Sequence, residues 1–189
     1  MATIPSVVNP RGIVMIADPP WVFTLFSTAR FAWLWLIIRV YAGYQWLTSG
    51  IDKLTNPAWW SGESLAGFWA NAIEVPAGGR AEITYAWYRN FIQFMHDAQW
   101  YTWFSKLIMF GEILIGIALI LGAFVGIAAF LGGFMNWNYI MAGSASSNGV
   151  LFSMAVVLVL AWKVAGWYGL DRYLLPMLGT PWQHHPPKV

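Results

Sequence analysis

Four long apolar runs dominate the pattern of hydrophobic and polar positions along the chain. Each run is about 19 to 21 residues long, enough for a helix to cross about 30 Å of hydrocarbon at about 1.5 Å per residue. Because a backbone in lipid must satisfy its hydrogen bonds within each segment, such runs are predicted to be helices. The predicted spans are residues 31–51, 103–121, 124–142 and 149–167. The pattern therefore predicts an all-α protein, a four-helix transmembrane bundle.

The connections between these runs are very unequal in length. Gly122 and Ala123 separate the second and third runs, and residues 143–148 separate the third and fourth. Such short connections make consecutive helices antiparallel neighbours. The segment 52–102 between the first two runs is long, and we expect it to lie outside the cytoplasm.

This outer segment contains a helical pattern of its own within Ala81 to Gln99. One stripe is apolar or aromatic and its neighbour is polar, as in an amphipathic helix lying in the membrane interface. The apolar stripe comprises Tyr85, Tyr88, Phe91, Ile92 and Met95, and the polar stripe comprises Arg89, Gln93, His96 and Asp97. The aromatic side chains predict an anchor at the membrane boundary or, alternatively, a lid over a lipid-soluble ligand.

The composition supports a membrane protein with one domain over residues 1–189. Hydrophobic residues make up 59% of the chain and charged residues only 10%, whereas soluble domains carry about a quarter charged residues. The net charge of +2 and the scattered basic residues argue against nucleic acid as a partner.

The distribution of basic residues favours cytoplasmic termini in a prokaryotic cytoplasmic membrane. An even number of spans places both termini on one side, and the positive-inside rule counts the Lys and Arg residues near the spans. That side holds Arg11, Arg30, Lys163, Arg172 and Lys188. In the outer segment, Lys53, Arg80 and Arg89 are outnumbered by acidic residues. The preference is modest because Lys53 and Lys106 also flank spans on the far side.

Two charged residues lie deep within the apolar runs, Arg39 in the first and Glu112 in the second. An ionised group at such a depth costs about 3 kcal/mol or more, so neither side chain should face lipid. Counted from the outer end, Arg39 lies at roughly 18 Å and Glu112 at roughly 14 Å, so a buried Arg39–Glu112 pair is geometrically feasible. Such a pair either locks two helices together or takes part in ligand binding. An unpaired, protonated Glu112 acting as a proton relay is a third interpretation.

Further polar and aromatic positions surround these charges in the outer half of the predicted bundle. Arg39, Trp46 and Lys53 recur at helical spacing on one face of the first run, and Asn136 and Asn138 lie near the end of the third. A ligand with an apolar body and a polar head would suit this place. Snorkelling at the interface explains Lys53 and Asn138 equally well.

The sequence lacks the ligands that several redox cofactors require. A transmembrane haem needs histidines on facing helices, but His96 lies in the outer segment and His184 and His185 lie in the tail. The chain has no cysteine, so we expect neither a thiol exchange site nor an iron–sulfur cluster. No metal-ligand spacing is present, and we expect no metal.

Four segments resemble the landmarks of the DoxX/DoxD membrane proteins, and together they cover about residues 30–178. They are Gly43–Leu54 (GYQWLTSGIDKL), Gly111–Gly122 (GEILIGIALILG), Asn136–Asn148 and Gly166–Leu175 (GWYGLDRYLL). The long aromatic outer segment, which begins Asn-Pro-Ala-Trp-Trp at Asn56, is more similar to the DoxD branch, the small membrane subunit of thiosulfate:quinone oxidoreductase.

The resemblance implies a four-helix bundle that works with a quinone and with a partner subunit. The positions that match the polar pattern of the family are Arg39, Lys53, Glu112, Asn136 and Asp171. No segment resembles the DoxA partner, so a thiosulfate activity would need a second chain.

Two functions therefore remain open. The first is an integral membrane subunit of a quinone-linked oxidoreductase, in which Glu112 exchanges protons and Arg39 or Asn136 hydrogen-bonds a quinone carbonyl. Trp46 and Lys53 are further quinone-binding candidates. The second is a non-catalytic structural or assembly subunit of a larger respiratory or photosynthetic membrane complex. Both functions imply lipid and other protein subunits as partners.

The predicted topology can be tested by labelling a cysteine inserted beside Gly78, because the natural chain contains none that would react as background. We expect a membrane-impermeant maleimide to react from the extracytoplasmic side. Reaction from the cytoplasmic side alone would reverse the topology.

Overall fold

The structure is a computed structural model that describes residues 6–8, 14–16, 18–79 and 81–179. The described chain is helical except for one antiparallel hairpin, in which β1 (Ser6–Val8) pairs with β2 (Val14–Ile16). This confirms the predicted all-helical class apart from the hairpin, which the sequence analysis did not anticipate. Some residues used in the orientation and haem arguments lie outside the described ranges, namely Arg11, Arg80, His184, His185 and Lys188.

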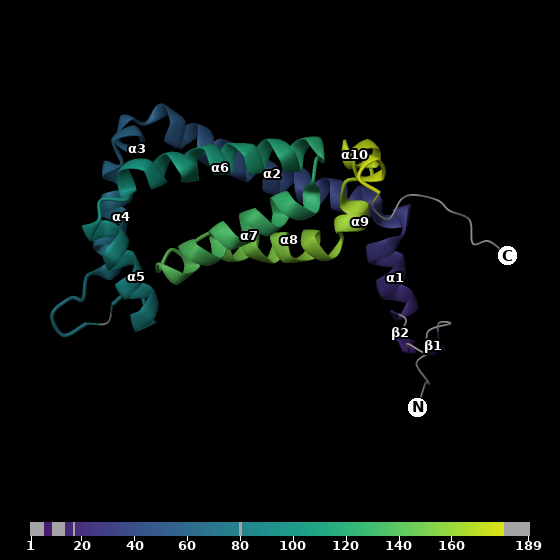
Figure 1. Ribbon diagram of the computed structural model, residues 1–189, viewed down its shortest axis with the longest axis horizontal. Coiled ribbons are helices and arrows are strands. Elements are labelled where there is room, and N and C mark those ends of the chain that lie inside the picture. The colour runs from purple at the N-terminus through teal and green to yellow at the C-terminus, as the bar shows by residue number, and fades with distance from the viewer. Residues whose placement is uncertain (1–5, 9–13, 17, 80, 180–189) are drawn as a thin grey trace.

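Four long helices correspond to the four apolar runs. They are α2 (Ala32–Thr55), α6 (Tyr101–Leu121), α7 (Val125–Met141) and α8 (Asn148–Leu160). The fourth run is broken at Ala161 and continues as the short α9 (Trp162–Ala165). Helix α2 packs mainly on α6, α7 packs mainly on α8, and the two pairs lie against one another (Figure 1).

Shorter helices occupy the two ends of this arrangement. The outer segment forms α3 (Pro57–Ser61), α4 (Glu63–Ile73) and α5 (Ala86–Asp97), of which only α5 was predicted. At the opposite end lie α1 (Pro20–Ser27), the 3₁₀ turn η1 (Ala29–Phe31), α9 and α10 (Asp171–Met177) (Figure 1). The outer segment therefore lies at the end away from the first and last described helices.

By length and apolar composition, α6 is the one described helix that is sufficient by itself to span a membrane. The pair formed by α1 and the helix Ala29–Thr55 passes the same criterion only when taken together, and it is bent by 62°. Helices α7 and α8 contain 17 and 13 residues, fewer than the about 20 of a typical span. The predicted all-α class is thus confirmed, whereas the four-helix transmembrane bundle stays a prediction, because only α6 among the described helices meets the length and composition criterion by itself.

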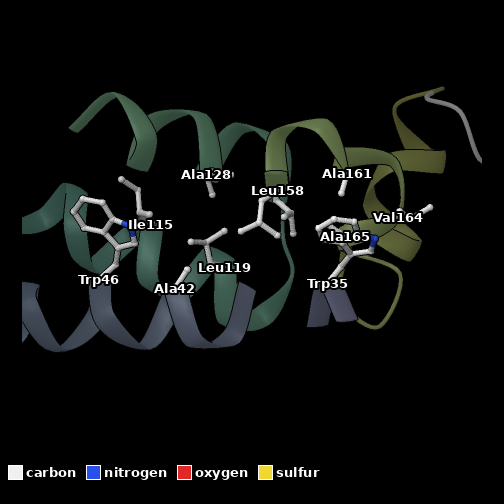
Figure 2. Close-up of a cluster of buried hydrophobic side chains, with 12 residues drawn as sticks. Trp35, Ala42, Trp46, Ile115, Leu119, Ala128, Leu158, Ala161, Val164 and Ala165 are labelled. Atoms are coloured by element: carbon white, nitrogen blue, oxygen red, sulfur yellow. The ribbon is translucent and has the colours of Figure 1, made fainter. Parts of the chain in front are cut away.

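Buried apolar side chains form two clusters. The larger one fills the space between the two helix pairs and includes Trp35, Trp46 and Leu158 (Figure 2). The smaller one joins α4 and α5 to the end of α7. Within the stripe predicted on α5, Tyr88, Ile92 and Met95 are buried there. Tyr85 and Phe91 of the same stripe are exposed, so the stripe lies partly in the core and partly at the surface, and its place in a membrane interface stays a prediction.

Glycines allow α2 and α6 to approach closely. A Cβ atom added at Gly116 would lie 2.6 Å from the Leu47 backbone nitrogen. Another added at Gly50 would lie 2.9 Å from the backbone nitrogen of Ile113. These contacts confirm Gly50 and Gly116 as packing positions and fix the register between the two helices.

We predict that Gly116→Leu destabilises the protein by about 3 kcal/mol or more, because the new side chain would push α6 away from the α2 backbone. Gly67→Ala is the matched control, since no atom lies within 4 Å of an added Cβ there. It should raise the stability of α4 by about 0.5–1 kcal/mol. Thermal unfolding in detergent, followed by circular dichroism, measures both. Equal melting temperatures for Gly116→Leu and the natural protein would contradict the close contact.

Candidate functional site

Glu112 lies at the centre of a buried polar network that joins three helices. Its Oε2 atom is 2.7 Å from Nζ of Lys53 on α2, and its Oε1 atom accepts a hydrogen bond of 2.9 Å from the Tyr139 hydroxyl on α7. The Lys53 ammonium also donates to Ser49 Oγ at 2.7 Å and lies 5.1 Å from the centre of the Trp59 ring. Glu112 is 1% exposed and the Lys53 side chain is 15% exposed, so only the lysine end of the pair approaches the surface.

Arg39 does not pair with Glu112, so the predicted Arg39–Glu112 pair is wrong. Glu112 is not unpaired either, because Lys53 and Tyr139 contact it. The Arg39 guanidinium group donates to the carbonyl oxygens of Leu119 and Ile120 at 2.6 and 2.7 Å, and to that of Tyr168 at 2.8 Å. The first two carbonyls lie in the last turn of α6, where they have no partner within the helix and where a positive charge is favourable. Arg39 therefore binds the end of α6 and holds the C-terminal segment against it.

The register between α2 and α6 explains why Arg39 cannot reach Glu112. Gly50 lies beside Glu112 in the α2–α6 contact, so Glu112 is level with a residue eleven positions beyond Arg39. That interval is roughly 16 Å along a helix, which is beyond the reach of the arginine side chain. The depths estimated from the apolar runs were too similar because the estimate placed the outer ends of the first two runs, Ile51 and Trp103, level with one another, whereas Gly50 lies beside Glu112.

Asp171 binds the other side of the α6–α7 turn, at the start of α7. Its two carboxylate oxygens accept hydrogen bonds from the backbone N–H groups of Phe124 and Val125, at the start of α7. A negative charge is favourable at this end of a helix. Burial raises the pKa of the Asp171 carboxyl above its ordinary value, while these N–H donors and the nearby Arg39 oppose the shift. Asp171 thus has a structural role at the α6–α7 turn.

Asn136 is fully buried, and within the described part of the chain neither atom of its amide group has a hydrogen-bond partner. Buried amides are seldom left unpaired. Its neighbours at helical spacing on α7 are Gly132 and Tyr139, which contact Trp46 and Glu112 respectively. Asn136 therefore faces the α2–α6 pair between those two contacts.

Trp46 belongs to the apolar core. It is 4% exposed and packs in the larger buried cluster with Ile115 and Leu119 (Figure 2). A Cβ atom added at Gly132 would lie 3.1 Å from its indole nitrogen. Trp46 thus fills the space between the two helix pairs.

A cavity of ≈ 530 Å³ lies among α4, α5, α6 and α7, within the range of small-molecule sites. Its wall is mostly apolar and carries polar groups from Tyr88, Asn138 and Tyr139. Tyr139 thus both lines the cavity and contacts Glu112. Glu112, Lys53 and Asn136 are not part of the wall. Among the described residues, Tyr139 therefore joins the cavity to the buried charges.

A hydrogen bond between α5 and α7 joins two residues of the cavity wall. The Tyr88 hydroxyl donates toward Asn138, whose Oδ1 and carbonyl oxygens lie 3.0 and 3.2 Å away. Burial raises the pKa of Tyr88 to about 12, so the phenol keeps its proton at neutral pH. The two interpretations of the aromatic segment, an anchor at the membrane boundary and a lid, both stay predictions.

The structure brings together only some of the residues proposed from the sequence. Lys53 and Glu112 form one site, Trp46 is in the core, and Arg39 lies at the opposite end of α6. Asn136 is buried one helical turn before Tyr139 on α7. Tyr139 was not singled out from the sequence, although it follows Asn136 by three residues and so shares its helix face. The signal that could have identified it is the Tyr139 phenol on the same helix face as the Asn136 amide, within an apolar run.

Comparison with known proteins gives one family match. The DoxX family model matches residues 34–145, more than half of the chain. No similar curated protein and no similar solved structure was found. The matched region contains Lys53, Glu112 and Tyr139 and ends before Asp171.

We predict that Lys53→Met destabilises the protein by about 3 kcal/mol, because it leaves the buried Glu112 carboxylate without its ion partner. The double variant Lys53→Met/Glu112→Leu should recover most of this loss. Arg39→Met/Glu112→Leu is the control, and its two effects should add within about 0.5 kcal/mol because the residues share no partner. Denaturant midpoints in detergent are measured for the single variants Lys53→Met, Glu112→Leu and Arg39→Met and for the two double variants. Additivity for Lys53 and Glu112 would contradict the ion pair.

Proposed function

The chain belongs to the DoxX family of membrane-associated proteins, and on this premise we propose that it is an integral membrane subunit that binds a quinone for a quinone-linked oxidoreductase. The observation that carries the proposal is the position of Tyr139, which lines the apolar cavity and whose hydroxyl group donates a hydrogen bond to Glu112. A ligand with an apolar body can fill the cavity, and its polar head can meet a group linked to a buried carboxylate.

The proposal includes four membrane crossings, by α2, α6, α7 and the pair α8–α9. Large apolar side chains are exposed on every one of these helices, for example Ile37, Leu114, Phe130 and Leu160. The buried polar and charged residues are instead Arg39, Ser105, Glu112, Asn136 and Asp171. Such an arrangement suits lipid outside and polar contacts inside. Helix α7, with 17 residues, covers roughly 26 Å, and the small mismatch can be met by local thinning of the bilayer.

Quinone is favoured as the ligand by the chemistry of the site. Reduction of a quinone to a quinol consumes two electrons and two protons. The electrons would come from the redox centre of a partner subunit, in keeping with the resemblance to the DoxD branch. Glu112 and Tyr139 would pass protons toward the cavity, and the partly exposed Lys53 would connect them to the outer surface. Thiosulfate is the electron donor that the resemblance suggests.

Arg39 and Trp46 are not assigned to the quinone in this proposal. Three hydrogen bonds occupy Arg39 at the far end of α6, and Trp46 is packed in the core. Asn136 is kept as a candidate for the head group or for an ordered water between it and Glu112, because its buried amide lacks other partners in the described chain.

We predict that Glu112→Gln slows quinone reduction by the isolated complex at least tenfold, because the amide keeps the shape of the side chain but cannot exchange a proton at neutral pH. The complex should still assemble and should still contain quinone in its solvent extract. Glu63→Gln, at an exposed position in the first turn of α4, is the control and should not change the rate.

An unchanged rate with Glu112→Gln would support the assembly function instead. In that case the purified complex should contain no quinone in this subunit, and substitutions on the exposed face of α5 should release partner chains. Trp87→Ala and Phe94→Ala are suitable, because both side chains are more than half exposed.

A further inference from the structure

The cavity reaches the outer flank of the helix pair. Five side chains in its wall are about half exposed or more, at 56% for Leu107, 66% for Leu114, 47% for Leu131, 55% for Phe134 and 46% for Phe91. Two of them belong to α6, two to α7 and one, Phe91, to α5. A side chain that both lines a cavity and faces outward marks the edge of an opening, so these residues form the rim of a mouth between α6 and α7 that α5 borders.

The helices leave room for this mouth. Helices α6 and α7 diverge from their short connection toward the end that carries α4 and α5 (Figure 1). Gly111 places no side chain in the wall, and even a Cβ atom added there would meet only the sulfur of Met135, at 3.7 Å. The contact between α6 and α7 is thus loose beside the cavity, in contrast to the tight contact of α2 with α6.

Away from Phe91, the part of the cavity wall that α5 provides is closed. Ile92 and Met95 are each 3% exposed there, and the Tyr88 hydroxyl donates a hydrogen bond from α5 to Asn138 on α7. A ligand that entered there would have to break this hydrogen bond and displace buried apolar side chains. The mouth between α6 and α7 requires neither change.

We infer that the ligand enters from the lipid phase through the mouth between α6 and α7, and that it is an amphiphile with a long apolar tail. The head reaches the polar wall at Asn138 and Tyr139, and the tail stays between Leu114 and Leu131. The inference rests on the proposed function and narrows its substrate class to quinones with a long isoprenoid tail. Because the tail passes from lipid to protein, exclusion from water adds nothing to its affinity. Each van der Waals contact adds little alone, but the contacts of several isoprene units in the apolar mouth add up.

The test compares two quinones with the same head group in protein reconstituted into lipid nanodiscs. One carries a decaprenyl tail and the other a single isoprene unit, and the bound amount of each is measured by chromatography of solvent extracts after removal of free ligand. The double variant Leu114→Trp/Leu131→Trp narrows the mouth. The control Ile117→Trp/Phe130→Trp places the same side chains at exposed positions of the same helices outside the cavity wall.

We expect the natural protein and the control to bind the long-tailed quinone at least tenfold more tightly than the short one. The mouth variant should lose most of this preference and should take up the long-tailed quinone at least tenfold more slowly. Equal affinities for both quinones, or unchanged uptake in the mouth variant, would overturn the inference while leaving quinone binding intact. Failure of both quinones to bind the natural protein would overturn the proposed function, and the inference with it.

Discussion

The close contact between α2 and α6 is the constraint on which the remaining structure depends. Gly50 and Gly116 bring the two backbones together, and the resulting register decides which polar groups meet. It places Lys53 beside Glu112 at one end and Arg39 beside the last carbonyls of α6 at the other. A shift of one residue would rotate each side chain by about 100° around its helix. Both buried charges would then lose their partners together.

The two ends of the molecule have different physical properties as a result. At the end near α9 and α10, Arg39 and Asp171 satisfy the backbone groups of the α6–α7 turn, and the helices are held tightly. At the other end the helix pairs separate. Helices α4 and α5 occupy part of the space between them, and the cavity is the part that stays open. A rigid end and an open end are what a site needs when its polar groups must stay in place while an apolar ligand enters.

The apolar runs predicted the long helices well, because length and hydrophobicity are properties of each segment alone. They also predicted that Arg39 and Glu112 are buried. The partners could not be predicted, since they depend on a register set by glycines on facing helices. The cavity and the role of Tyr139 were beyond reach for a similar reason, because they arise where α5 folds back on α7. The fourth apolar run is interrupted at Ala161, which is itself apolar. Hydrophobicity therefore did not predict where this helix breaks.

In the proposed topology, the contacts of Arg39 also set an order for membrane insertion. The arginine would enter with α2, but its first acceptor is 80 residues further along the chain and its last is 129 residues away. Until α6 and then the segment at Tyr168 have been synthesised, the guanidinium group would have to remain hydrated or be held by the insertion machinery. Insertion of the first span would therefore be completed only when nearly the whole described chain has been made.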